Sequence, residues 1–215
     1  MQILYEDDDV LVVNKPAGIA VHGGPNVSGQ TVADYFKDKI TDSDKERSGI
    51  VHRLDKDTSG VIIMAKNPQA KKFLQKQFKD RTVQKTYIAL VRGKPKHPEA
   101  ILDWPIGRNP KNPLKQAVVG QGKSAVSHYK TLQEFNGYTL LEVMPKSGRT
   151  HQIRVHLSHL GHPVVGDRVY GTDEPKLNRY FLHAKKLQIV LPSGEQHDFE
   201  SELPTELSEY LVGLK

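Results

Sequence analysis

One stretch decides the interpretation of this chain: VHRLDKDTSGV, at residues 51–61. It sets Asp55 among cations, with Arg53 before it and Lys56 after it, and it runs into the apolar segment VIIMA at 61–65. A short apolar segment of this kind predicts a buried strand. A carboxylate close to an arginine stays ionised, and an ionised carboxylate in a loop at a strand edge can act as a nucleophile or a base. The stretch therefore predicts a reactive aspartate beside a sheet.

Two superficial motif matches in this stretch fail. A protein-kinase catalytic loop reads His-Arg-Asp, but Leu54 intervenes here, and neither a glycine-rich phosphate loop nor Asp-Phe-Gly accompanies it. The Asp-Thr-Gly turn of aspartic proteases is interrupted by Ser59, and no second copy supplies the paired carboxylate. For Asp57 and Thr58 we favour a structural role, with both side chains bonded to the backbone of the turn.

The composition excludes several kinds of protein and of catalytic site. The 215 residues include no cysteine, which excludes disulfides, a thiolate nucleophile and cysteine-based zinc sites. Lysine and arginine outnumber aspartate and glutamate by 31 to 25, giving a net charge of +6, which is compatible with a polyanionic partner. No apolar run is long enough to cross a bilayer, and acids at 7–9 replace the pattern of a signal peptide. We expect a cytoplasmic protein that does not bind membranes.

The patterning predicts an α+β fold with a mixed, largely antiparallel central sheet and flanking helices. Asn136-Gly137 between two alternating segments indicates a hairpin. Neither a repeat nor a linker is visible, so we expect one domain over residues 1–215. Strands are expected at 3–6, 10–13, 61–65, 86–91, 129–132, 139–143 and near 187–190, and helices at 31–40, from 68 onward, at 150–160 and after 204.

Several segments carry more specific expectations. The helix after Asn67-Pro68 should bury Ala70, Phe73, Leu74 and Phe78 and present Lys71, Lys72, Gln75, Lys76 and Lys79 to solvent. A solvated face is slightly favoured over an RNA contact for these cations. The polar stretch 41–48 and the Pro-rich basic stretch 104–113 are expected to be surface loops. Lys15-Pro16 fits a strand terminator with a solvated lysine and a support for an active-site wall equally well.

The complete stretch 51–61 resembles the signature of the RluA family of pseudouridine synthases. The resemblance continues in family order through VVNKPAG at 12–18, KTYIALVRG at 85–93, SGRTHQIRVH at 147–156, GHP at 161–163, GD at 166–167 and FLHA at 181–184. It covers nearly the whole chain. Larger members of the family carry an S4 domain ahead of the catalytic domain; here the catalytic pattern begins at Ile3, so we expect RNA affinity to come from the catalytic domain itself.

The resemblance implies roles for five residues. Asp55 corresponds to the family's catalytic aspartate and Tyr87 to its active-site tyrosine. Arg149 corresponds to the basic residue that pairs with the aspartate. Arg53 corresponds to the arginine that helps to occupy the stack when the base is extruded, and Leu182 to an apolar residue of the uracil pocket. Sequence alone does not bring Tyr87 or Arg149 to Asp55.

The implied reaction converts uridine to pseudouridine in structured RNA. It breaks the N1–C1′ bond, turns the uracil and joins C5 to C1′, with no redox step, so neither a cofactor nor a metal is expected. The carboxylate could attack C1′ or C6 or promote loss of the 2′ proton, and these routes stay open. The target must leave the stack, which favours loops and bulges. Large-subunit rRNA is the first expectation for the substrate and tRNA the second, with a monomeric enzyme.

Two other functional classes and a zinc site fit the sequence less well. A non-catalytic RNA-binding or assembly protein on the same scaffold would tolerate loss of Asp55, Tyr87 or Arg149, yet all three are present. A nucleoside hydrolase would need a second carboxylate or an activated water, and Asp57 is the only nearby candidate. The histidines at 151, 156, 159 and 162 do not form an accepted zinc pattern, and we expect His156 to be packed or hydrogen-bonded.

Overall fold

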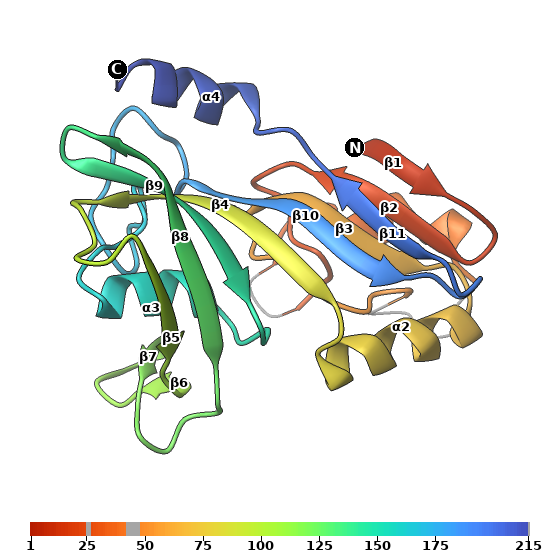
Figure 1. The fold of residues 1–215 in the computed structure, drawn as a ribbon. Coiled ribbons are helices and arrows are strands. Elements are labelled where there is room, and N and C mark those ends of the chain that lie inside the picture. The colour runs from red at the N-terminus through yellow and green to blue at the C-terminus, as the bar shows by residue number, and fades with distance from the viewer. Residues whose placement is uncertain (25–26, 42–47, 215) are drawn as a thin grey trace. The chain divides into compact units, whose positions relative to one another are not determined.

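The computed structural model describes residues 1–24, 27–41 and 48–214, so positions 42–47 of the expected loop at 41–48 lie outside the described residues. The chain divides into two compact units, each of which is treated by itself. Unit 1 comprises Met1–Gln84 and Ala184–Glu202, and unit 2 comprises Lys85–His183 and Leu203–Lys215. The strand and helix content is that of an α+β protein with largely antiparallel pairing, as the patterning predicts (Figure 1).

Unit 1 is built on a sheet in the order β1-β2-β3-β10, with β11 paired to β10. The edge strands β1 and β11 lie close to each other. The ring centroid of Tyr5 on β1 is 5.4 Å from the ring centroids of both His197 and Phe199 on β11. The elements are β1 (Gln2–Glu6), β2 (Val10–Lys15), α1 (Val32–Tyr35), a 3-10 turn η1 (Lys37–Lys39), β3 (Ser59–Ala65), α2 (Pro68–Asp80), most of β10 (Leu182–Val190) and β11 (Gln196–Glu200).

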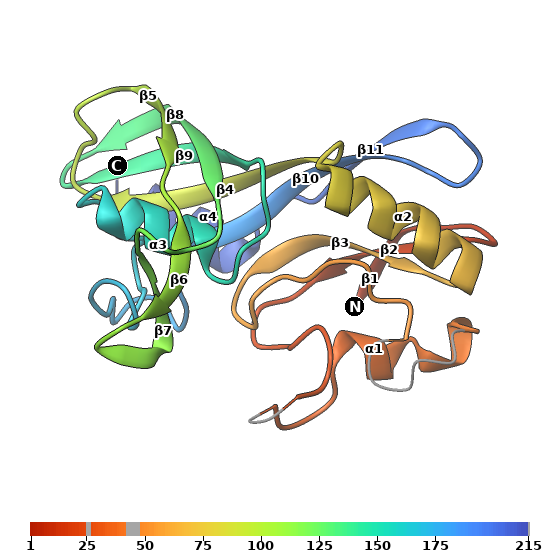
Figure 2. The same cartoon turned by 90° about the horizontal axis from the view of Figure 1, so that it is seen from below.

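The strand β3 is buried along its whole length, which explains its unbroken apolar sequence. Val61 and Ile63 of β3 pack with Ala70 and Leu74 of α2 in one core cluster. Side chains alternate across a strand, so Ile62 and Met64 point to the other face. Figure 2 shows α1 and α2 on opposite sides of these strands.

Local signals set the helix boundaries in unit 1. The side chain of Asn67 accepts a hydrogen bond from the backbone N–H of Ala70 at 2.9 Å, and Pro68 opens α2. Thr31 and Asp34 form a complete capping box at α1. Two expectations are wrong here. The helix expected over 31–40 breaks after Tyr35 into α1 and η1, and Phe73, expected in the buried stripe, is 39% exposed.

Unit 2 is built on an antiparallel sheet in the order β4-β9-β8-β5. Its core packs Leu141 and Val143 of β9 with Leu157 and with Phe181. The elements are β4 (Gln84–Arg92), β5 (Glu99–Asp103), β6 (Ile106–Asn109), β7 (Asn112–Val118), β8 (Val126–Phe135), β9 (Tyr138–Pro145), α3 (Gln152–His159) and α4 (Thr205–Val212).

The expected hairpin is present in unit 2. Phe135 pairs with Tyr138 across Asn136-Gly137, and Gly137 has the positive φ of 78° that a glycine adopts without strain. The stretch 104–113, expected to be a loop, instead contains β6 and the start of β7, which pair as a second hairpin. None of the helices in the described ranges is long and apolar enough to span a membrane.

Candidate active site

Asp55 lies in a tight turn of unit 1 that leads into β3. The segment begins where Ile50 bridges to Met64, and the backbone N–H of Thr58 donates to the carbonyl of Asp55 at 3.1 Å, which closes the turn. Leu54 is buried and anchors the turn, whereas Asp55 is half-buried and Arg53 is exposed. The carboxylate of Asp55 is therefore carried by an ordered turn beside a buried strand, as the sequence predicts.

A glycine allows this turn to join the sheet. Gly60 has a φ of 117°, and a Cβ atom added to it would lie 2.1 Å from the carbonyl oxygen of Ala184 on β10. No side chain fits in that space, so the glycine that ends the motif lets the backbones of β3 and β10 approach each other. The neighbouring side chains of Thr58 and Ser59 are buried as well.

His52 holds the segment that precedes Asp55. Its Nε2 atom accepts a hydrogen bond of 3.0 Å from the backbone N–H of Ile63, and its ring stacks on Phe78 of α2 with centroids 4.6 Å apart. Because a backbone N–H can only donate, Nε2 carries no proton in this arrangement. The sequence does not predict that His52 accepts a hydrogen bond and stacks on Phe78, because both partners lie far from it in the chain.

Lys15 holds the turn from another side. The side chain is 0% exposed, and its Nζ atom donates to the carbonyls of Pro16, Ile19 and Lys56 at 2.9, 2.8 and 2.9 Å. The backbone N–H of Gly18 donates to the same Lys56 carbonyl at 3.0 Å. A buried ammonium group needs such partners to offset its lost hydration. Lys15 thus supports the turn that carries Asp55, and the solvated alternative is wrong.

Three of the predicted site residues belong to unit 2. Tyr87 lies on β4, is half-buried and packs against the core cluster that also contains Leu182, the first residue of β10, which is 3% exposed. Arg149 lies in the loop between β9 and α3, where its Nε atom donates to the carbonyl of Ser124 at 3.1 Å. The structure thus places Tyr87 and Leu182 in one core. Asp55 belongs to the other unit, so the proximity of these three residues to Asp55 stays a prediction.

Gln152 shapes the loop that carries Arg149. Its Oε1 atom accepts from the hydroxyl of Ser147 at 2.7 Å and from the backbone N–H of Arg149 at 3.0 Å. Its Nε2 atom donates to the carbonyl of Val126 and to the hydroxyl of Ser127. The side chain is buried, so these four bonds satisfy its polar atoms. Its position in the sequence, at the start of α3, does not reveal this role.

A buried ion pair also holds α3 in unit 2, through Arg154 on the helix and Asp167 beyond it in the chain. The guanidinium of Arg154 forms a bidentate ion pair with Asp167. Its Nε atom donates to Oδ2 at 2.7 Å and its Nη2 atom donates to Oδ1 at 2.9 Å. Burial acts to raise the pKa of Asp167, but hydrogen bonds and charge from Arg154, with the N–H groups of Val169 and Tyr170, hold that pKa below its usual value. The guanidinium also lies 4.2 Å from the centroid of the Tyr180 ring. The pair therefore stays charged and rigid.

The clustered histidines serve packing in unit 2. His156 is fully buried, with Nδ1 3.1 Å from the hydroxyl of Ser127 and Nε2 3.0 Å from the carbonyl of Trp104. Burial lowers its pKa, so it is neutral at physiological pH. His159 packs its ring against Trp104. Over the described ranges, no three His, Asp or Glu side chains converge as a metal site would require.

Comparison with known proteins agrees with this geometry. Residues 9–159, which include the turn of Asp55, β4 and α3, match the model of the RNA pseudouridylate synthase family. The chain belongs to this family.

Relatives of the family resemble the whole chain. The chain is 41% identical to ribosomal large subunit pseudouridine synthase D of Nitrosomonas europaea, with 100% of this chain and 65% of that protein covered. It is also 41% identical to the uncharacterized RNA pseudouridine synthase YlyB of Bacillus subtilis, covering 73% of it. The chain thus spans about two thirds to three quarters of the length of these relatives.

Solved structures of the family share the fold. Human RNA pseudouridylate synthase domain containing 1 superposes with a TM-score of 0.79 and 28% identity, covering 99% of this chain and 94% of that one. Human RNA pseudouridylate synthase domain containing 4 gives the same score and identity, with 92% of its chain covered. The α+β pseudouridine synthase fold and the family that the motifs of the sequence predict are both confirmed.

Proposed function

We propose that this chain isomerises uridine to pseudouridine in RNA, with Asp55 as the catalytic carboxylate. The observation that carries the proposal is the anchored turn of Asp55 within the segment that matches the family. Three independent anchors hold the turn: the buried Leu54, the acceptor on His52 and the buried ammonium of Lys15. Such preorganisation is what a reaction needs when it depends on the placement of one carboxylate.

The reaction is an isomerisation, so every atom of uridine is kept. The N1–C1′ bond breaks, the uracil turns in place, C5 bonds to C1′, and the proton that C5 loses is balanced by the proton that N1 gains. An ionised Asp55 can attack C1′ or C6, or accept the 2′ proton. Each of these routes begins with the carboxylate in its charged form.

We propose roles for three residues of unit 2 and for Arg53 as well. Arg149 uses Nε for the carbonyl of Ser124, and within the described residues no hydrogen bond engages its terminal nitrogens, which suits them to a carboxylate partner. Tyr87 stacks on the base and its hydroxyl handles the proton at C5. Leu182 excludes water, so that the detached uracil rejoins the sugar instead of leaving. Arg53, exposed beside Asp55, enters the space that the flipped nucleotide vacates.

The substrate that we propose is structured RNA, with large-subunit rRNA first and tRNA second. A relative with 41% identity over the whole chain carries the name ribosomal large subunit pseudouridine synthase D, which favours rRNA. We also propose that the enzyme is a cytoplasmic monomer with residues 1–215 acting as one catalytic domain, and that it uses neither a cofactor nor a metal.

The test is a map of pseudouridine in total RNA with and without the protein, using wild type and Asp55→Asn. The variant keeps the shape of the side chain and removes its charge, so we expect at least a 1,000-fold loss of rate, roughly the scale of losing an essential catalytic group, with RNA binding retained. Normal turnover by Asp55→Asn would refute the proposal. Binding without product in the wild type would favour the assembly protein, and release of free uracil would favour the hydrolase.

A further inference from the structure

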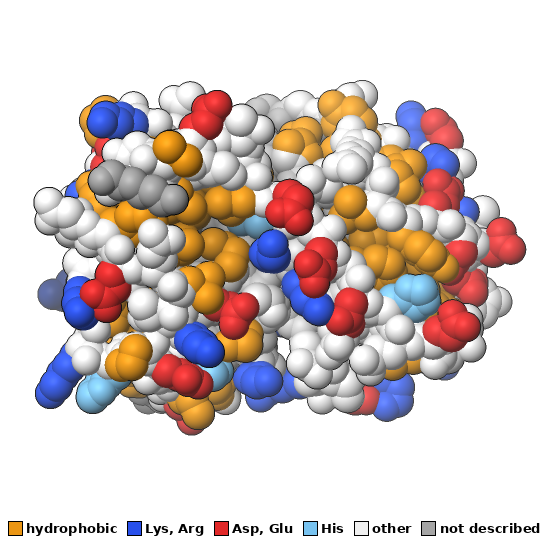
Figure 3. Space-filling model, turned by 45° about the horizontal axis from the view of Figure 1, so that its top comes forward, with side chains coloured by type: hydrophobic (Ala, Val, Ile, Leu, Met, Phe, Trp, Pro, Cys, Tyr) orange, Lys and Arg blue, Asp and Glu red, His pale blue; other side chains and the backbone are white. Residues whose placement is uncertain are grey.

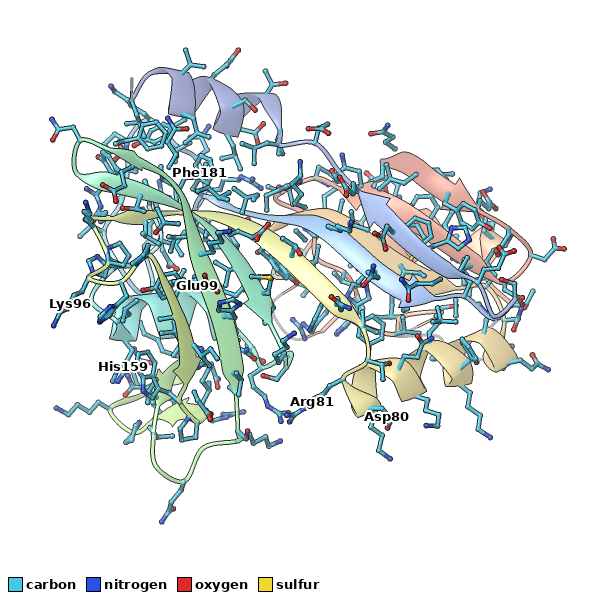
Figure 4. All side chains as sticks on the ribbon, viewed as in Figure 1. Asp80, Arg81, Lys96, Glu99, His159 and Phe181 are labelled. Carbon is cyan, nitrogen blue, oxygen red and sulfur yellow. The ribbon has the colours of Figure 1, made fainter. Side chains whose placement is uncertain are left out.

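Helix α2 presents a one-sided basic surface. Its 13 residues include four lysines and one aspartate, and Arg81 follows at its C-cap. Lys72, Lys79 and Arg81 are exposed, and Lys76, 77% exposed, pairs with Asp80. We call Lys72, Lys76, Lys79 and Arg81 the basic face of α2. Figure 4 shows Asp80 and Arg81 at the C-terminal end of the helix.

The charge of this face is poorly compensated. Among the described residues, no carboxylate lies within ion-pair distance of Lys72, Lys79 or Arg81. On the face drawn in Figure 3, by contrast, Lys and Arg side chains alternate with Asp and Glu. A protein surface with interspersed signs repels polyanions about as much as it attracts them, whereas the basic face of α2 attracts them.

The basic face of α2 adjoins the turn that carries Asp55. Phe78 of α2 stacks on His52, and the next residue after each ring is an exposed cation, Lys79 and Arg53 respectively. The helix is also fixed to the sheet, because the side chain of Gln77 donates to the carbonyl of Val190 and accepts from its N–H at 2.8 and 3.1 Å. The cations therefore stand on a rigid support at a defined distance from the proposed catalytic carboxylate.

We propose that the basic face of α2 binds the phosphate backbone of the substrate RNA next to the nucleotide presented to Asp55. The inference rests on the proposed function and adds the surface that would hold the flanking strand. Exposed lysines bind phosphate through charge and release its counterions, with no requirement for base sequence. An acidic protein is the less suitable partner, because protein interfaces rely on clusters of aromatic and aliphatic anchors at their centre, and the only large apolar side chain that α2 exposes among its described residues is Phe73.

The test compares three variants in binding to transcribed large-subunit rRNA over a range of salt concentrations. The first is Lys72→Gln/Lys79→Gln/Arg81→Gln. The second, a matched control, removes the same charge from exposed lysines of unit 2 through Lys96→Gln/Lys130→Gln/Lys176→Gln. The third is Asp80→Asn, which releases Lys76 from its ion pair. Pseudouridine formation at saturating RNA is measured in parallel.

We expect the α2 triple variant to bind roughly 10- to 100-fold more weakly and to lower the slope of log affinity against log salt by about 2 to 3, since three phosphate contacts are lost. The rate at saturating RNA should stay within about twofold of wild type, because the variant removes ground-state binding only. Asp80→Asn should bind about two- to threefold more tightly with a steeper slope, since it frees one cation. Impaired folding would not produce such a gain.

Equal losses in the α2 triple variant and the matched control would overturn the inference, because net charge alone would then explain binding. So would an effect of the α2 triple variant confined to a polyglutamate peptide, which would assign the face to an acidic protein. The proposed activity is judged separately. Absence of pseudouridine from the wild-type reaction would refute the activity, and a selective loss of rRNA binding by the α2 triple variant would still support the surface.

Discussion

At the scale of single residues, two side chains outside the proposed chemistry hold the turn of Asp55. His52 accepts from β3 and stacks on α2, while Lys15 satisfies carbonyls on both the turn and the segment 16–19. Both are positioning residues, since neither needs to touch the substrate to act. Their removal should therefore affect the placement of the carboxylate more than the binding of RNA.

The two interactions of His52, its hydrogen bond from Ile63 and its stacking on Phe78, can be separated by substitution. His52→Phe keeps an aromatic ring for Phe78 but leaves the backbone N–H of Ile63 without its acceptor, at a cost of about 1 to 3 kcal/mol. We expect kcat to fall about tenfold with little change in KM. Single-turnover kinetics on saturating RNA, together with the denaturation midpoint, would measure both effects.

The counterpart variant, His52→Gln, keeps an acceptor and loses the ring. Partial recovery of kcat relative to His52→Phe would show that the acceptor positions Asp55. If both variants kept wild-type kcat, His52 would be a packing residue only.

At the scale of elements, α3 depends on a charge pair within unit 2. Arg154 of α3 and Asp167 are 5% and 0% exposed at their side chains, so removing one partner leaves the other charged and buried. Helices of this length are marginal by themselves and rely on such tertiary contacts. The pair thus supports the element that also supplies Gln152 to the loop of Arg149.

Asp167→Asn should destabilise the protein by about 3 to 5 kcal/mol at neutral pH, because the guanidinium of Arg154 loses its counter-charge. The folded pKa of Asp167 is depressed, so the stabilisation exists above the unfolded pKa, about 3.9, and disappears as the pH falls through the folded value. The difference between wild type and variant should therefore shrink under acid. Urea unfolding at neutral pH and near pH 3 would measure this.

Asp173→Asn provides the matched control. Asp173 pairs with Arg168 through the same Nε contact, at 2.8 Å, but both side chains are more than half exposed. Exposed pairs contribute little. We expect no measurable change from this variant, and an effect as large as that of Asp167→Asn would show that burial is not what gives the Arg154 pair its importance.

The elements also show where sequence patterns succeed. Asn67-Pro68 starts α2 and Asn136-Gly137 turns the hairpin because capping and turn geometry depend on neighbours in the chain. Short polar strands carry no such signal. The sequence patterns do not predict β5, β6, β7 and β11, since these segments become strands only when a partner strand supplies hydrogen bonds.

At the scale of the whole molecule, the chain passes three times between the two units, at 84/85, 183/184 and 202/203. The first passage falls after the first residue of β4 and the second falls inside β10, so two strands contribute residues to both units. We therefore expect the units to unfold together, in line with the prediction of one domain. Scanning calorimetry should give a single transition whose calorimetric and van't Hoff enthalpies agree. Two resolved transitions would mean that the units are separate domains.

The sequence alone determined the family, the fold class and most long elements, and it singled out Asp55 as the carboxylate that we propose to be reactive. These follow from local patterns and from motifs whose residue order is preserved in the chain. Tertiary structure alone decided that Lys15 is buried among carbonyls, that His52 accepts from Ile63, that Gly60 faces the backbone of β10 and that Phe73 is exposed. The physical reason is that burial and hydrogen-bond partnership belong to pairs of groups brought together by folding, often from distant parts of the chain, and no single position carries that information.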